Sequence, residues 1–182
     1  MFIVGGSLLS GCAAYTIAPR LSLLEQSPPY LYTDADWAEV LSRHVHEGLV
    51  HYERLAQQRE PLDRYYAILS RTGPSLTPDQ FTTRHQAMAY WINAYNALVL
   101  LAVLENYPIS TIHDISLPSL TSHYTFAVDG QARDLRAIEE KALEAGAGDV
   151  RVLFAMSSGA LGTPRLGDQP MRAGSLERQL VQ

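Results

Sequence analysis

The apolar stretch TPDQFTTRHQAMAYWINAYNALVLLAVLENYP, residues 77–108, limits the possible folds most strongly. Its apolar residues recur at helical spacing, and from Ala87 to Leu104 they lie on nearly every side of the helix. A helix that is apolar all round has to be covered by the rest of the protein. We therefore predict one helix, or two in succession, at the buried centre of the protein. Thr77 is its predicted cap, Pro78 occupies the first helical position, and Pro108 marks its end.

The order of the remaining elements predicts the α+β class. Helical spacing indicates helices over residues 34–58, 60–74, 133–146 and 174–182. Thr33 or Asp34 caps the first of these, and Gly48 could divide it into two. Alternation around Asp129-Gly130 predicts a β-hairpin. The β-rich run DVRVLFAM, residues 149–156, predicts a buried core strand. Helices precede a hairpin, a helix and a strand, which is typical of α+β folds.

Length and charge exclude some classes of protein. The chain has 182 residues, which is enough for about one domain. Its formal net charge is −5, and no basic stripe alternates with aromatic residues. We therefore expect no nucleic-acid partner, and we expect no cofactor.

The N-terminus is similar to a bacterial lipoprotein signal. The apolar run MFIVGGSLLSGC ends at Cys12, the one cysteine of the chain, and LSGC resembles the lipobox at which such cysteines are lipid-modified. We predict a signal peptide over residues 1–12, a Pro/Ser/Leu-rich tether over 13–33 and a domain over 34–182. A buried strand with a free cysteine is the alternative. Ala13 in place of aspartate predicts a membrane-anchored protein on the periplasmic face of the outer membrane.

Small hydroxyl residues follow the predicted core strand in FAMSSGALGTP, residues 154–164. Ser158 is a candidate nucleophile, but the segment lacks the glycine before the serine of the G-x-S-x-G elbow. A serine nucleophile also needs a base, and no histidine follows His123. Asn93 and Asn96 stand in the apolar helix and need hydrogen-bond partners there. They either orient a catalytic group or substrate, or form a structural clamp, and the second interpretation is favoured.

Three histidines lie close together in HVHEGLVH, residues 44–51. On a continuous helix His44 and His51 would share one face, with Glu47 between them. The segment nearly matches the zinc motif H-E-x-x-H, but His51 comes one residue too late. A metal site through His44 and His51 is therefore the weakest hypothesis, and solvated or capping histidines are favoured; we assign no metal site.

Several segments together resemble one bacterial family, DUF547. The resemblance rests on AYWINAYNALVL, VLENYPI, FAVDGQARDLRAIEEKAL and VRVLFAMSSGALGTPRL, and it covers roughly residues 36–172. The last family motif is matched at Arg151, Phe154, Ala155, Gly159, Ala160, Pro164 and Leu166. Ser158 stands where the family carries cysteine, and Thr163 stands where it carries a second cysteine. Leu153 and Glu140 occupy positions at which the family has histidine. Ser157 occupies the position of a family asparagine. The family also continues beyond LERQLVQ, so we expect a C-terminally incomplete domain.

The resemblance implies a site without its thiol chemistry, because the cysteine and both histidine positions differ. We expect a lipid-anchored envelope protein, non-catalytic, that binds an envelope partner or small ligand or acts as a scaffold. A polar cluster of Asn93, Asn96, Ser157 and Arg151 would form or support its site. The alternative is an envelope hydrolase or acyl transferase with Ser158 as nucleophile and Glu140 as base.

Overall fold

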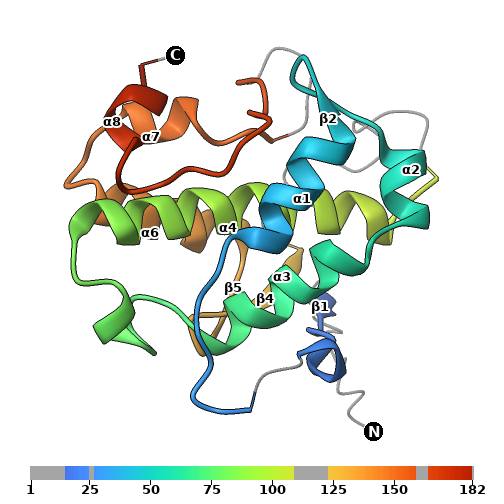
Figure 1. Cartoon of the computed structure of the whole chain (residues 1–182), viewed down its shortest axis with the longest axis horizontal. Helices are drawn as coiled ribbons and strands as arrows, with labels where there is room; N and C mark the ends of the chain where they lie inside the picture. Colours follow the sequence, from blue (N-terminus) through green and yellow to red (C-terminus); the bar gives the residue numbers. More distant parts are fainter. Residues whose placement is uncertain (1–14, 25–26, 109–122, 159–163, 182) are drawn as a thin grey trace, which may run out of the picture.

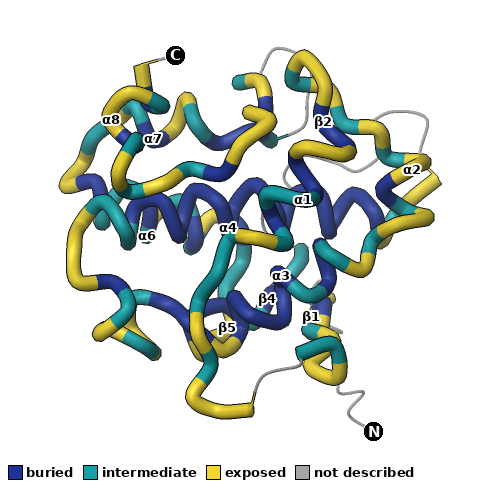
Figure 2. Tube along the Cα trace, viewed as in Figure 1, coloured by how far each residue is buried: buried dark blue, intermediate teal, exposed yellow. Residues whose placement is uncertain are grey.

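A long buried helix forms the centre of the structure (Figures 1 and 2). The computed structural model describes residues 15–24, 27–108, 123–158 and 164–181. Helix α4 (Arg84–Glu105) is buried without a break from Met88 to Leu104. Among the described residues, α4 is the one helix that is long and apolar enough to span a membrane. In this structure, however, 94% of an 18-residue apolar stretch of α4 is buried inside the protein. The predicted central helix is thus confirmed as a core element.

The predicted cap of this helix was wrong by six residues. Pro78–Gln80 forms a separate 3-10 turn, η2, and α4 begins after Thr83. The Thr83 hydroxyl accepts a hydrogen bond from the Gln86 amide at 3.2 Å, while the Thr83 amide donates to Gln86 Oε1 at 2.9 Å. This reciprocal capping box satisfies two backbone amides at once. Gln80 stands three residues after Thr77, but its side chain bonds the backbone of Tyr30 and Tyr32 instead, so no capping box forms there.

Four further helices surround α4: α1 (Ala35–His44), α2 (Tyr52–Gln57), α3 (Glu60–Arg71) and α6 (Leu135–Ala145). Both α3 and α6 pack against α4, and α1 packs on α3. The Asp134 carboxylate caps α6 by accepting from the Ala137 amide at 2.7 Å. Helix α3, helix α6 and the start of α1 after Asp34 agree with the predicted helices.

The predicted first helix is interrupted between His44 and Tyr52. Strands β2 (Val45–His46) and β3 (Leu49–Val50) pair antiparallel across a two-residue turn. Glu47 and Gly48 have φ values of 52° and 80°, the conformation that a tight hairpin requires and that a right-handed helix does not allow. A continuous helix through this segment was therefore wrong, and Gly48 lies at the break.

A small three-stranded sheet lies beside the helices, in the order β1-β4-β5. The hairpin of β4 (Tyr124–Val128) and β5 (Gln131–Arg133) turns at Asp129-Gly130, as predicted. Strand β1 (Tyr15–Ile17) pairs parallel to β4. This strand falls within residues 13–33, so part of the expected tether is held against the domain.

The predicted core strand is instead a turn of helix. Helix α7 (Arg151–Phe154) buries Val152, but Leu153 is 37% and Phe154 71% exposed. The Asp149 carboxylate accepts from the Arg151 amide at 3.0 Å and starts the turn. A second short helix, α8 (Leu176–Gln179), follows in the predicted place. The α+β class is confirmed, with the strand of residues 149–156 as its main correction.

Tyr66 joins β1 to the rest of the sheet and provides a test of this fold. Its hydroxyl donates to the Ile17 carbonyl at 2.5 Å and accepts from the Ala127 amide at 2.9 Å. Tyr66→Phe leaves both backbone groups without this partner, so we expect a loss of about 1–3 kcal/mol in the free energy of unfolding by urea. Tyr15→Phe, at a side chain that is 60% exposed, is the control. Equal stabilities of the two variants would contradict this role of Tyr66.

Candidate functional site

The side chain of Asn96 fixes the segment that follows α7. Its Nδ2 donates to the Ala155 carbonyl at 2.9 Å, and its Oδ1 accepts from the Ser157 amide at 2.8 Å. Asn96 is 4% exposed, so both ends of the amide meet their partners away from solvent. The amide thereby replaces a neighbouring strand and holds the backbone on either side of Met156.

Asn93 makes the same arrangement with the segment before α8. Its Nδ2 donates to the Met171 carbonyl at 2.9 Å, and its Oδ1 accepts from the Met171 amide at 2.8 Å. Asn93 and Asn96 lie three residues apart, so they share one face of α4. We call this pair the asparagine clamp. It ties two C-terminal segments, which are far apart from α4 in the sequence, to the central helix.

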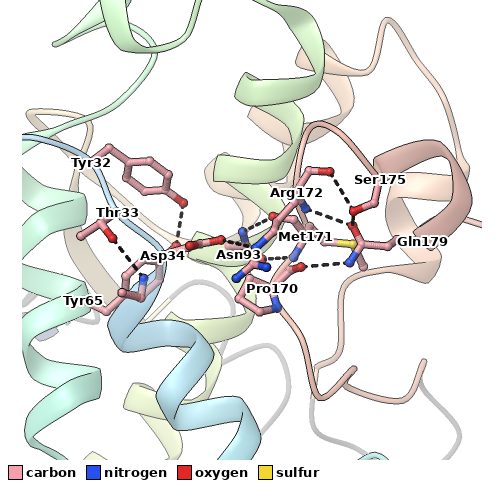
Figure 3. A network of polar contacts seen from close by, with 11 residues as sticks. Tyr32, Thr33, Asp34, Tyr65, Asn93, Pro170, Met171, Arg172, Ser175 and Gln179 are labelled. Atoms are coloured by element: carbon pink, nitrogen blue, oxygen red, sulfur yellow. Dashed lines mark hydrogen bonds and ion pairs between the residues drawn. The ribbon is translucent and has the colours of Figure 1, made fainter.

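Further polar contacts hold the second segment in place (Figure 3). Gln179 accepts from the Arg172 amide at 3.0 Å and from the Ser175 hydroxyl at 2.9 Å, and it donates to the Pro170 carbonyl at 2.9 Å. Arg172 forms an ion pair with Asp34 at 3.1 Å, which links this segment to the start of α1. The ion pair joins residues 138 positions apart, so no local motif in the sequence indicates it.

A pair of tyrosines, partly buried Tyr32 and fully buried Tyr65, lies next to this network. Their hydroxyls are 3.1 Å apart, and Tyr32 is drawn beside Asp34 in Figure 3. Burial raises the pKa of Tyr32 to about 12, so this phenol stays protonated and remains a hydrogen-bond donor over the ordinary pH range.

The two predicted catalytic residues are not joined by a hydrogen bond. Ser158 is partly exposed and forms no hydrogen bond with any residue that the structure describes. Glu140 is exposed on α6, where its partner is Arg136 at 3.3 Å. The adjoining motif residues 159–163 lie outside the described residues, as does Cys12.

Arg151 and Ser157, the other predicted members of the polar cluster, have different surroundings. Ser157 is buried and bound to Asn96 through its amide. Arg151 instead pairs with Asp149 at 2.5 Å and with Glu177 at 2.9 Å. The hydrogen bonds that Arg151 donates, first to Asp149 and then to Glu177, raise the pKa of its guanidinium. Arg151 therefore ties α7 to α8 and contacts neither asparagine of the clamp by a hydrogen bond among the described residues.

The three histidines do not share a helix face, since the β2–β3 hairpin separates them. His44 is 1% exposed, and its Nδ1 lacks a hydrogen-bond partner in the described part of the chain. Burial is the main cause that lowers the pKa of His44, and the positive charges of the nearby Arg54 and Arg43 lower it further. The rings of His46 and His51 meet edge to face at 5.4 Å. Within the described ranges, no three His, Cys, Asp or Glu side chains are grouped to hold a metal ion.

A cavity of about 440 Å³ opens beside the asparagine clamp. It lies between α1, α4, α7, α8 and the segment of residues 165–172. Its lining combines Trp37, Leu41, Asn93, Asn96, Phe154, Ala155, Arg165, Leu166, Gly167, Asp168, Gln169, Pro170, Met171, Arg172, Ser175, Arg178, Gln179 and Leu180. The cavity therefore has apolar walls on the core side and charged side chains toward solvent.

The fold and the clamp define an α+β domain whose central helix holds two C-terminal segments by buried amides. Comparison with protein families gives a match over residues 78–182 to the family described as protein of unknown function, DUF547. The chain belongs to this family. Neither a curated protein nor a solved structure matches the chain.

The asparagine clamp predicts a measurable stability effect. Asn96→Ala removes the hydrogen bonds to the Ala155 carbonyl and from the Ser157 amide inside the protein, so we expect a loss of about 2–4 kcal/mol in the free energy of unfolding. Gln57→Ala, at an exposed position of α2, is the control and should change stability by less than about 0.5 kcal/mol. Chemical denaturation followed by circular dichroism measures both, and a similar effect of the two changes would rule out the clamp.

Proposed function

We propose that this protein is a non-catalytic binding module of the bacterial cell envelope, anchored in a membrane through Cys12. The observation that carries the proposal is the state of the predicted catalytic pair. Ser158 forms no hydrogen bond with a described residue, and Glu140 is turned to an ion pair with Arg136. A working serine nucleophile needs a base within about 2.6–3.2 Å of its hydroxyl.

The binding role is supported by the cavity beside the clamp. Its volume of about 440 Å³ suits a small molecule, and pockets of this kind combine apolar walls with a few polar groups. The clamp keeps the backbone around Ala155 and Met171 in place whether or not a reaction occurs. At the positions where the resemblance implies a cysteine and two histidines, this chain carries Ser158, Leu153 and Glu140, which agrees with a cavity that binds without thiol chemistry.

The anchor is supported by the position of β1. Tyr15 is paired in the sheet and lies three residues after Cys12, and three residues of extended chain reach about 10 Å. A lipid on Cys12 would therefore hold the domain directly against the membrane surface. Ala13 after the cysteine supports the periplasmic face of the outer membrane as the location.

The second candidate is an envelope hydrolase or acyl transferase that uses Ser158. It is favoured by the partial exposure of Ser158 just after the segment that the clamp fixes, at the place where the family carries cysteine.

A fluorophosphonate probe separates the two candidates, because it labels only serines that a base has activated. For the non-catalytic module we expect no labelling of the purified protein at a concentration that fully labels an active serine hydrolase. Ser158→Ala is the matched variant. Labelling that disappears in Ser158→Ala would overturn the non-catalytic proposal and favour the second candidate.

The anchor is tested by metabolic labelling with radioactive palmitate in a Gram-negative host. We expect label in the full chain and none in Cys12→Ser, because the thiol carries the lipid. Membrane fractionation should find the wild-type chain, and not the variant, with the outer membrane. Equal labelling of the two chains would contradict the anchor and leave the question of catalysis unaffected.

A further inference from the structure

Two surface regions of the protein differ in whether their arginines form ion pairs with carboxylates. On the face formed by α1 and α3, every arginine that lines a surface depression is paired with a carboxylate: Arg20 with Asp63, Arg43 with Glu39, Arg59 with Asp63 and Arg64 with Asp36. In the cavity beside the clamp, Arg165 and Arg178 have no carboxylate partner among the described residues. Among the described residues, the cavity therefore holds two guanidinium groups that no carboxylate neutralises through an ion pair.

The overall balance of charge makes this cavity distinctive. The protein carries a formal net charge of −5, yet three arginines and one aspartate line the cavity. Asp34 neutralises Arg172 through an ion pair. The charges that remain in the lining are those of Arg165, Arg178 and Asp168, so positive charge is in excess. Unpaired guanidinium groups beside low-dielectric walls attract anions more strongly than the same groups on an open surface.

Arg165 is held in position by the β2–β3 hairpin. Its stem lies over Gly48, where an added Cβ would be 2.6 Å from Arg165 Cβ and 2.9 Å from Arg165 Cγ. Its guanidinium donates to the Glu47 carbonyl at 3.4 Å, a long contact that leaves the remaining donors available. A side chain fixed in this way loses less conformational entropy when it binds a ligand.

The inner wall of the cavity is apolar. Trp37, Leu41, Leu166 and Leu180 are buried there, and Phe154 at the same cavity is 71% exposed. Covering Phe154 would remove apolar surface from water, which favours a ligand that carries an apolar body as well as a charge.

We propose that this cavity binds a small amphiphilic organic anion, with its carboxylate or phosphate between Arg165 and Arg178 and its apolar body against Phe154 and the inner wall. The inference deepens the proposed function, because it rests on the cavity being a binding site. Guanidinium groups bind carboxylate and phosphate through paired hydrogen bonds, so both headgroups share this chemistry.

The test is isothermal calorimetry on the purified full chain with four probes: octanoate, octyl phosphate, inorganic phosphate and octyl glucoside, each below its critical micelle concentration. We expect the better of the two octyl anions to bind at least about tenfold more tightly than inorganic phosphate or octyl glucoside. Tighter binding of octanoate assigns the site to carboxylates, and tighter binding of octyl phosphate assigns it to phosphate esters. Added salt should weaken this binding.

Variants locate the binding. Arg165→Gln and Arg178→Gln should each weaken binding of the preferred anion about tenfold, the effect of one charge-assisted contact. Arg71→Gln, at an exposed arginine outside the cavity, is the matched control and should leave binding unchanged. Gly48→Ala keeps both charges but displaces the Arg165 stem, so it should weaken binding while a thermal melt shows that the domain is still folded.

The inference would be overturned if neither octyl anion bound, or if Arg165→Gln and Arg178→Gln left the binding unchanged. Octyl glucoside bound as tightly as the anions would also overturn it, while the cavity would still be a binding site and the proposed function would stand. Fluorophosphonate labelling of Ser158, in contrast, would remove the non-catalytic proposal even if the anions bind, so the two failures are distinguishable.

Discussion

The structure depends on one constraint: amides placed in a buried helix have to find partners away from water. Helix α4 is apolar on all sides and supplies the core, but Asn93 and Asn96 cannot be buried there unpaired without a cost of about 1–3 kcal/mol each. They pair with backbone groups around Ala155 and at Met171. The core helix thereby also determines where two C-terminal segments lie, and the cavity forms between them.

The sequence predicted those parts of the fold that local signals determine. The burial of α4 follows from its apolar pattern, the β4–β5 hairpin from Asp129-Gly130, and the end of α6 from Gly146. The misassigned parts had ambiguous signals. A β-rich run as short as residues 149–156 suits a buried strand or a packed helical turn equally well, and within α7 only Val152 is buried.

The candidate site was predictable only in part, for a related reason. Burial required hydrogen-bond partners for Asn93 and Asn96. Which residues supply them depends on the tertiary fold, so the sequence could not identify them. The Arg172–Asp34 ion pair was likewise not predictable, because it joins residues 138 positions apart. The contacts of Gln179 with Arg172 and Pro170 are closer in sequence, but they depend on how the loop before α8 folds. The β2–β3 hairpin was missed because positive φ at Glu47 carries no sequence signal of its own, although Gly48 beside it did suggest a break.

A clamp made of buried amides holds backbone atoms and does not depend on which side chains the held segment carries. Asn96 bonds the Ala155 carbonyl and the Ser157 amide, so neither hydrogen bond involves the side chain of the neighbouring Ser158. Arg165 is likewise held by the hairpin backbone and the absence of a side chain at Gly48. Backbone contacts of this kind are independent of which nucleophile stands at the turn. The proposed absence of a nucleophile and the proposed binding role of the cavity are therefore compatible, because different atoms support the turn and the cavity.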